Sequence, residues 1–338
     1  MKNYSVLSKI LHKAYLKNYF ISRASLELEF DLHKKKILQK EIEKVVFISG
    51  LARSGTTILL RKVFSSNEFA SLQYNNMPFL FLPNLWSPKS KIKSYERAHG
   101  DSIKINESSP EEFDEYFWKV HLDDSYINNN HLNIHEIDNV FLDNYIKYIK
   151  LVCLSKSQKN YITKNNNNIL RISSLYKIPN SYFFFLIRNP LDHASSLLKL
   201  HKKFIKEQKK DIFSLDYFNF LGHHEFGIGH KPFNLIYSIF DQLKDFDINS
   251  IEYWLIIWKQ YYCYLLKIYN ENFIIILFED FIMGEDQIVD FINQLLKIKI
   301  AESKDKKFIP PSYKNHSSNI LDECNQIYSL FLEKRKYV

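Results

Sequence analysis

Two short stretches of the sequence place arginine and hydroxyl side chains at spacings that suit a bound phosphate group. The first is GLARSGTT at residues 50–57, in which Gly50 and Gly55 bracket Arg53, and Thr56 and Thr57 follow. It comes after the apolar run KVVFIS and has the frame GxxxxGK[ST] of a phosphate-binding loop, except that Thr56 stands in the lysine position. Backbone N–H groups of such a loop, and of the helix after it, point at an anion.

The missing lysine changes the ligand that this loop is expected to hold. In nucleotide triphosphatases the lysine reaches the β and γ phosphates, and the hydroxyl after it holds magnesium. Thr56 cannot supply that charge, whereas the guanidinium of Arg53 can. We therefore predict an anion site without a metal ion, formed by Arg53, Ser54, Gly55, Thr56 and Thr57. A glycine-rich turn that binds nothing is the alternative interpretation.

The second stretch is RNPLDHASS at residues 188–196. Asn189 can cap a helix whose first residue is Pro190, and Asp192 lies in the first turn, where a carboxylate is favoured. Arg188 then ends a strand, at the edge where open α/β sheets bind ligands, and Ser196 lies about two turns into the helix. The alternative is an arginine paired with a surface acid, beside a serine on a solvated helix face.

Taken together, RSGTT and RNPLDHASS resemble two sites of sulfotransferases that use 3′-phosphoadenosine 5′-phosphosulfate (PAPS), most closely the bacterial branch. RSGTT is similar to the 5′-phosphosulfate loop of that family. The family's 3′-phosphate motif, RxPxDxxxS, is matched by Arg188, Pro190, Asp192 and Ser196. The resemblance runs from about Val45 to Phe281. It implies a P-loop-like α/β fold, PAPS as the sulfate donor and adenosine 3′,5′-bisphosphate as the product.

Further residue roles follow from the same resemblance. The segment YITKNNNNILRI is similar to one in which related enzymes place a lysine before the strand that leads to the 3′-phosphate arginine. This implies that Lys164 contacts the sulfate or the bridging oxygen, and that Arg53 and Lys164 stabilise the charge that develops during transfer. The adenine-binding loop RKGxxGDWK of the cytosolic branch is absent, so the adenine contacts are left unassigned.

Sulfuryl transfer also needs a base for the acceptor, and the family uses histidine in some branches and glutamate in others. We predict His99, in RAHGD, as a base oriented by Asp101, with a surface turn as the alternative reading of the same residues. Glu111 and Glu112 follow Ser109 and are more typical of acids in the first turn of a helix.

The stretch LGHHEFGIGH at 221–230 raises the question of a metal site. Adjacent histidines project in different directions, and the helical HExxH pattern is broken by Gly227 and Gly229. A glycine-flexible loop near the acceptor is therefore favoured over a metal centre.

Three apolar runs predict the sheet that must position these residues. KVVFISG (44–50), SYFFFLIRNP (181–190) and NFIIILFED (272–280) lack polar alternation, as strands buried on both faces do. Helical patterns lie between them, which predicts an α/β fold with a central, mostly parallel sheet and flanking helices. Glu279 and Asp280 are expected to form structural hydrogen bonds.

The remaining segments complete the predicted organisation. Residues 75–160 are expected to form a largely helical insertion, with a helix starting at Pro110 behind a Ser109 cap. The asparagine runs are interpreted as low complexity. We predict one domain over residues 1–338, with an N-terminal helical segment (1–43), the α/β core (44–300) and a C-terminal segment (301–338).

Composition excludes several classes of protein. The chain has 338 residues, of which 46% are hydrophobic, and a formal net charge of +8, so it is not a disordered chain. The lysines lie in short clusters among acids, which is typical of solvated faces and not of a nucleic-acid stripe. Three cysteines without CxxC spacing predict neither disulfides nor zinc. Without a signal peptide or a long apolar run, we expect a cytoplasmic protein.

The function expected from the sequence is sulfate transfer from PAPS to a hydroxyl or amine of a small-molecule, glycan or lipid acceptor. The alternative is a P-loop kinase or an NTPase-like nucleotide-binding protein. This is disfavoured because Thr56 replaces the lysine and no strand end offers a clear second acid for magnesium. A binding module that keeps the loop without chemistry is a third possibility.

Overall fold

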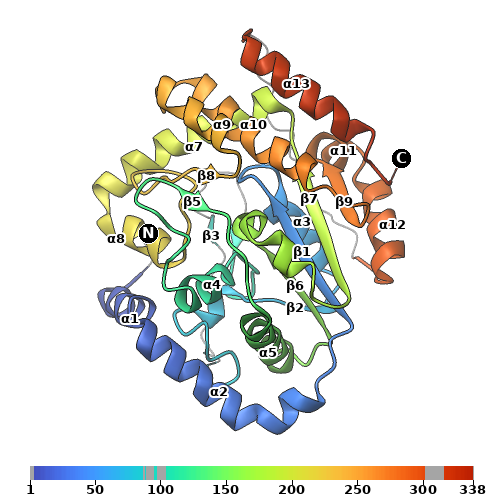
Figure 1. Cartoon of the computed structure of the whole chain (residues 1–338). Helices are drawn as coiled ribbons and strands as arrows, with labels where there is room; N and C mark the ends of the chain where they lie inside the picture. Colours follow the sequence, from blue (N-terminus) through green and yellow to red (C-terminus); the bar gives the residue numbers. More distant parts are fainter. Residues whose placement is uncertain (1–3, 87, 89–94, 97–103, 301–315, 338) are drawn as a thin grey trace.

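The computed structural model describes residues 4–86, 88, 95–96, 104–300 and 316–337, and an all-parallel sheet lies at its centre (Figure 1). Its strand order is β2-β6-β1-β7-β9. The strands span Phe69–Ala70 (β2), Asn160–Lys164 (β6), Lys44–Gly50 (β1), Ser181–Ile187 (β7) and Phe273–Leu277 (β9). The predicted fold class, an α/β fold with a mostly parallel central sheet, is confirmed.

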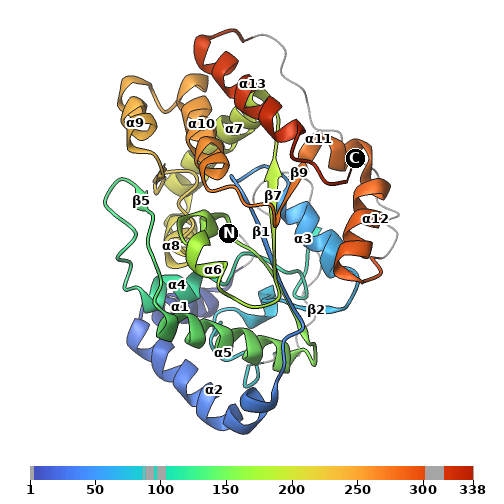
Figure 2. The same cartoon turned by 45° about the vertical axis from the view of Figure 1, so that its right-hand side comes forward.

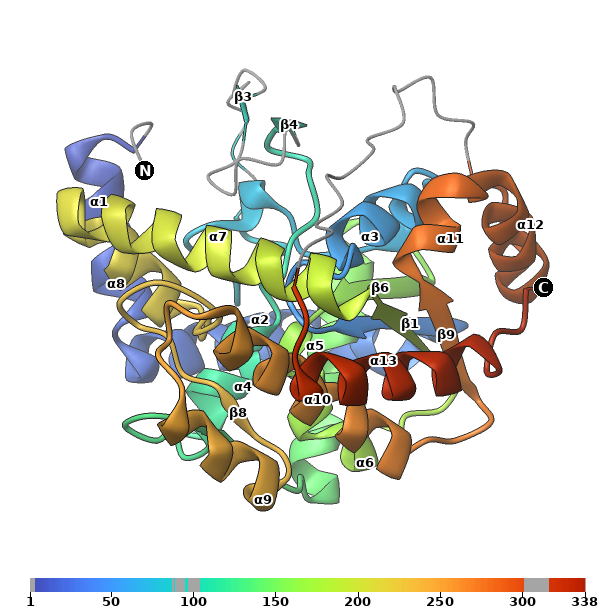
Figure 3. The same cartoon turned by 90° about the horizontal axis from the view of Figure 1, so that it is seen from above.

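Both faces of the sheet are buried, because alternate residues of each strand pack into two separate cores. Val45 and Phe47 of β1 belong to the larger core, while Val46 and Ile48 belong to the smaller one. The smaller core is covered by α3 (Thr56–Phe64), α11 (Phe278–Met283) and α12 (Glu285–Leu296). The larger core is covered by α5 (Asn139–Ser155), α10 (Ile251–Lys267) and α13 (Asn319–Leu332). Figure 3 shows α3 and α12 on the opposite side of the sheet from α10 and α13.

Two helices precede the first strand. They are α1 (Val6–Leu16) and α2 (Tyr19–Gln39), and α2 runs beside α5 in both side views (Figures 1 and 2). The hydroxyls of Ser22 in α2 and Tyr116 in α4 (Glu115–His121) lie 2.6 Å apart. The N-terminal helices therefore pack against the insertion that carries part of the candidate site.

The insertion differs from its prediction at one important point. Its helix α4 begins at Glu115, not at Pro110. Pro110 instead forms an isolated antiparallel bridge with Gln73, and the N–H of Glu111 donates to the carbonyl of Leu72. Because these contacts hold the backbone extended, the helix starts five residues later than the Ser-Pro-Glu pattern predicts. Short strands flank this region: β3 (Tyr95–Glu96), β4 (Lys104–Ile105) and β5 (Leu132–Asn133).

The remaining elements connect the strands or cover the sheet. They are α6 (Ile172–Leu175), α7 (Pro190–Lys210), α8 (Ile212–Phe220), β8 (Phe233–Asn234) and α9 (Tyr237–Phe240). Within the described residues, no helix has both the length and the apolar character that crossing a membrane requires.

Candidate functional site

The predicted anion loop joins β1 to α3 through a tight turn. Arg53 and Gly55 adopt positive φ angles of 75° and 99°. A Cβ atom on Gly55 would lie 2.5 Å from Cδ2 of Phe278, so a larger residue would be both strained and obstructed there. Ser54, Thr56 and Thr57 are buried against the turn. Because α3 starts at Thr56, the N–H groups of its first turn face the loop, as in an anion site.

The second motif lies at the carboxyl end of the neighbouring strand β7. Arg188 follows this strand, and Asn189 caps α7 by accepting from the N–H groups of Leu191 and Asp192 at 3.1 Å and 3.3 Å. The Arg188 guanidinium lies over the ring of Phe278, 4.7 Å from its centroid, and donates to the carbonyl of Arg53 at 3.3 Å. The predicted cap and helix start at Pro190 are both confirmed.

The two motifs meet in space. Nε of Arg53 donates to Oγ of Ser196 at 3.3 Å, although the residues are 143 positions apart. His193 reinforces the contact, because its Nε2 donates to the carbonyl of Ala52 at 2.8 Å. Burial and the charge on Arg188 together lower the pKa of His193 to about 3, so the ring is neutral at physiological pH. A single ligand can therefore contact the loop and the start of α7 together.

Residues after β9 support this edge of the sheet in the structural role predicted for them. Glu279 accepts from the N–H of Asn189 at 2.8 Å and from the hydroxyl of Tyr328 at 2.9 Å. Asp280 pairs with Arg335 at 2.9 Å. Both acids are thus committed to holding α7 and the C-terminal segment.

Lys164, the last residue of β6, is paired with Glu112. Its Nζ donates to one carboxylate oxygen of Glu112, and the N–H of Asn166 donates to the other. Both side chains are nearly inaccessible, at 8% for Lys164 and 2% for Glu112. Burial raises the pKa of Glu112 to about 7, against the opposing charge of Lys164. The prediction of Glu111 and Glu112 as first-turn helix acids is wrong, because both residues precede α4, which begins at Glu115.

A buried polar network fixes this pair in place. The guanidinium of Arg171 donates to both oxygens of Glu115 at 2.8 Å and 2.9 Å, and Nδ2 of Asn165 donates to the same carboxylate at 2.8 Å. The asparagines at 165–168 are all buried. The interpretation of this run as mere low complexity is therefore wrong, since the side-chain amides of Asn165, Asn166 and Asn167 donate to Glu115, Glu225 and the carbonyl of Gly222.

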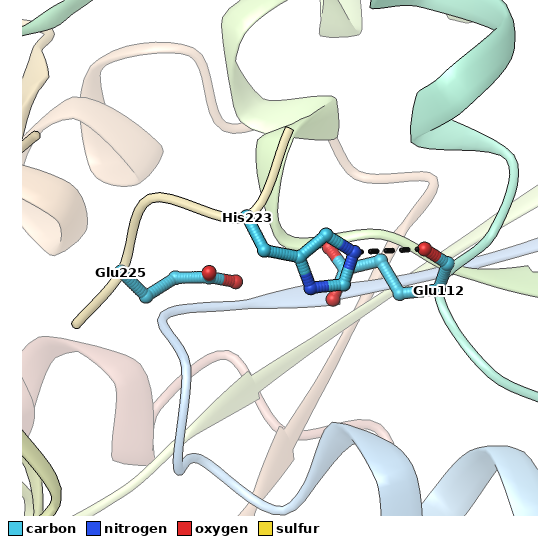
Figure 4. Close-up of side chains that lie close together, drawn as sticks. All are labelled: Glu112, His223 and Glu225. Atoms are coloured by element: carbon cyan, nitrogen blue, oxygen red, sulfur yellow. Dashed lines mark hydrogen bonds between the residues drawn. The ribbon is translucent and has the colours of Figure 1, made fainter. Parts of the chain in front are cut away.

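The segment 223–225 also lies against the pair formed by Lys164 and Glu112. Nε2 of His223 donates to the backbone carbonyl of Glu112 at 3.0 Å, and Glu225 accepts from Nδ2 of Asn166 at 2.9 Å (Figure 4). Ligand atoms of Glu112, His223 and Glu225 lie within 4.8 Å of one another. Two carboxylates and an imidazole suit a transition metal. Both oxygens of Glu112 already accept hydrogen bonds, however, so a metal would have to displace Lys164.

A small, partly open pocket lies between this segment, the anion loop and α7. Leu51 and Ala52 of the loop line it, together with Leu197 of α7 and Trp254 of α10. Glu225 lines it as well. His224, His230 and Lys231 line it too, so it offers an apolar wall beside the anion loop and a polar side of mixed charge.

The structure brings together all but one of the predicted site residues. Arg53, Ser54, Gly55, Thr56 and Thr57 share one loop, and Arg188, Ser196 and Lys164 lie at the same edge of the sheet. His99, the predicted base, lies outside the described residues.

His223 and Glu225 were missed as partners of Lys164, because their sequence spacing carries no signal for a contact across the fold. A weaker signal did exist for Glu112: a buried lysine at a strand end requires an acid nearby.

Comparison with known proteins agrees with this geometry. No protein-family model matches the sequence, and no curated protein does. Among solved structures, sulfotransferase STF9 from Mycobacterium avium aligns with a TM-score of 0.53 at 13% identity, over 95% of this chain and 84% of that one. Sulfotransferase STF1 from Mycobacterium tuberculosis aligns with a TM-score of 0.50 at 12% identity, over 99% and 87%. The chain has the fold of sulfotransferases, which confirms the fold that the resemblance implied.

Proposed function

We propose that this protein transfers a sulfuryl group from PAPS to a hydroxyl or amine of an acceptor molecule. The observation that carries the proposal is the contact between Arg53 and Ser196, which joins the two anion-binding motifs at one edge of the sheet. PAPS carries a phosphosulfate and a second phosphate on one adenosine, and so matches two adjacent anion sites. The sulfotransferase fold supports the same conclusion.

Each motif has a distinct task in this proposal. The N–H groups and hydroxyls of residues 53–57 bind the 5′-phosphosulfate, and Arg188 and Ser196 bind the 3′-phosphate. Lys164 contacts the sulfate. Its ammonium has three donors and uses one of them on Glu112, so the ion pair can persist while the lysine binds the donor.

Catalysis then consists mainly of positioning and charge stabilisation. The acceptor oxygen attacks sulfur in line with the bridging oxygen, as in phosphoryl transfer. Arg53 and Lys164 stabilise the charge that develops on the sulfate and the leaving phosphate. The site needs no metal for this step, since the cations are side chains.

The cavity beside the anion loop is the proposed acceptor site. It borders the loop at Leu51 and Ala52, where an acceptor must lie to reach the sulfur, and its apolar wall suits a molecule with an apolar or aromatic body. The acceptor class is therefore a small molecule, glycan or lipid with such a body next to its reactive group.

Calorimetry tests the donor assignment. Adenosine 3′,5′-bisphosphate should bind without magnesium and more tightly than adenosine 5′-phosphate, which lacks the 3′-phosphate. Magnesium-dependent binding of ATP in its place would reject the proposal in favour of a kinase or NTPase. Salt-sensitive RNA binding, with no response to either nucleotide, would point to a binding module.

Transfer itself is tested with labelled PAPS and a lysate of the source cell. The expected result is a labelled product whose sulfate sits on a hydroxyl or amine beside an apolar group. A protein that binds the bisphosphate but transfers no label, either to the lysate or to water, would not be a sulfotransferase.

A further inference from the structure

Sulfate transfer to a hydroxyl requires a base with an available lone pair next to the sulfate. Glu112 does not meet this requirement, because one of its carboxylate oxygens accepts from Lys164 and the other from the N–H of Asn166. Its side chain is also 2% exposed, so an acceptor cannot reach it directly. Glu112 therefore holds other groups in place and does not take the proton itself.

His223 does present a suitable nitrogen. Its Nε2 bonds to the carbonyl of Glu112, and a carbonyl can only accept, so Nε2 carries the ring hydrogen. The neutral ring then has its lone pair on Nδ1. Figure 4 shows Nδ1 away from the bond to the Glu112 backbone carbonyl, with the carboxylates of Glu112 and Glu225 nearby. His223 is partly exposed, unlike Glu112.

The charges around His223 favour proton uptake. Glu112 and Glu225 face the ring from two different segments, and Lys164 is the cation nearest to them. Burial alone would lower the pKa of His223, but the two carboxylates outweigh burial and Lys164, and the pKa is raised. Glu225 remains ionised, because His223 and Lys164 overcome the effect of its burial and lower its pKa.

His223 is also close to the proposed reaction. It bonds to Glu112, whose carboxylate bonds to Lys164, the residue proposed to contact the sulfate. Its neighbours in sequence, His224 and Glu225, line the cavity proposed for the acceptor. The ring thus lies next to the residue that pairs with the sulfate-binding lysine, and the two residues that follow it in sequence line the proposed acceptor cavity.

We propose that His223 is the catalytic base of this enzyme. Glu225 and Glu112 hold its ring in position and balance the positive charge that the ring gains with the proton. This inference rests on the proposed sulfotransferase function. In the step, the acceptor oxygen forms a bond to sulfur while the bond from sulfur to the bridging phosphate oxygen breaks. The electron pair of that bond stays on the phosphate of adenosine 3′,5′-bisphosphate. The hydroxyl proton moves to Nδ1 of His223.

The first test compares His223→Gln with a matched histidine variant. Labelled PAPS is supplied with the lysate as acceptor pool, and label released to water is followed in the same reactions. His223→Gln should slow transfer by about 100-fold or more, the usual contribution of a general base. Its affinity for adenosine 3′,5′-bisphosphate should stay within about twofold, which also shows that the variant folds. His131→Gln, at a partly exposed turn near β5, should behave as the wild type.

The second test is the pH dependence of the transfer rate, which would be the same with and without His223 if the role of this residue were purely structural. Wild-type transfer should fall as the pH drops, because protonated His223 cannot accept a proton. That acidic limb should disappear in His223→Gln. In Glu225→Gln it should shift to lower pH, since the ring loses one of the carboxylates that raise its pKa.

The outcomes separate this inference from the function on which it rests. If the wild type binds no adenosine 3′,5′-bisphosphate, both fail. If the wild type transfers label and His223→Gln retains more than about a third of that rate, or keeps the acidic limb, only the assignment of His223 fails. Loss of transfer on chelation, with recovery on adding zinc, would show that Glu112, His223 and Glu225 hold a metal, and would also overturn the assignment.

Discussion

Arg188 recognises an anion through the shape of its guanidinium as well as through its charge. The group is stacked on Phe278 and donates to the carbonyl of Arg53, which fixes its plane. Arg188→Lys keeps the positive charge but loses the planar set of N–H donors that a guanidinium presents to an anion. We expect the variant to bind adenosine 3′,5′-bisphosphate about 10- to 150-fold more weakly, equivalent to losing one charged hydrogen bond of about 1.5 to 3 kcal/mol. Calorimetry measures the difference.

A second ligand makes this prediction specific. Adenosine 5′-phosphosulfate lacks the 3′-phosphate, so its affinity should be nearly the same for Arg188→Lys and the wild type. Arg23→Lys serves as the control, since Arg23 pairs with Asp123 and neither residue belongs to either motif. An equal loss for both nucleotides would mean that Arg188 supports the loop and does not bind the 3′-phosphate.

The ion pair between Lys164 and Glu112 makes a different prediction, because it concerns stability. Removing one member of a buried pair leaves the other charge without compensation, at a cost of about 3 to 5 kcal/mol. Lys164→Met should therefore lower the free energy of unfolding by about this amount in denaturant titrations. The double variant Lys164→Met, Glu112→Leu should recover much of the loss.

An exposed pair provides the control for this experiment. Lys159 and Glu43 lie 2.9 Å apart with side chains 68% and 49% exposed, so Lys159→Met should change stability little. If Lys164→Met proved as mild as Lys159→Met, the pair at the end of β6 would be solvated, and its place in the site would need revision.

Among the elements, the turn between β1 and α3 is tightly constrained by its backbone. Gly55 combines a φ of 99° with a close approach to Phe278, so Gly55→Ala introduces both strain and a clash. We expect a loss of about 1 to 3 kcal/mol in unfolding free energy, together with weaker binding of adenosine 3′,5′-bisphosphate. Denaturant titration and calorimetry measure the two effects.

Gly284→Ala is the matched control for this turn. Gly284 has a φ of −119° and would place a Cβ 3.3 Å from the nearest atom, the carbonyl oxygen of Asp280. The substitution should be far milder than Gly55→Ala. Similar losses for the two variants would show that the positive φ of the loop is not essential.

The elements also differ in how far the sequence reveals them. Strands β1, β7 and β9 were predictable, because burial on both faces produces uninterrupted apolar runs such as VVFIS and FFFLI. Helix α7 was predictable because its start depends on local contacts between Asn189 and the next residues. In each case the cause of the structure lies within a few residues of the signal.

The start of α4 and the group around Lys164 were not predictable for the opposite reason. The bridge between Gln73 and Pro110 is non-local, and it overrides a local pattern that favours a helix. Glu112 and Lys164 are 52 positions apart and meet only after the sheet has formed. The resemblance predicted a role for Lys164, but only the fold shows that Glu112 pairs with it and that His223 lies nearby.

Over the whole molecule, buried histidines tie stability to pH. Burial lowers the pKa of seven of the described histidines: His12, His121, His135, His193, His201, His224 and His230. In the unfolded chain each takes up a proton near its ordinary pKa of 6.5, whereas in the folded protein it stays neutral to lower pH. The unfolded state therefore binds more protons, and stability must fall as the pH drops below about 6.5.

Groups with raised pKa values act in the opposite direction, namely the acids Glu112, Asp114 and Glu279, together with His223. Burial raises the pKa of Glu112 to about 7 and that of Asp114 to about 6, so folding favours their protonated forms as the pH falls. The histidines outnumber them, and each unbalanced proton changes the unfolding free energy by about 1.4 kcal/mol per pH unit. We thus predict a steep loss of stability between pH 6.5 and 5, measured by denaturant titration at each pH. Ordinary carboxyl groups stay largely ionised in this window, so they contribute little. His193→Gln should reduce the slope of unfolding free energy against pH by the contribution of one proton, about 1.4 kcal/mol per pH unit. A stability that is flat or rises towards pH 5 would show that these histidines are protonated within the fold.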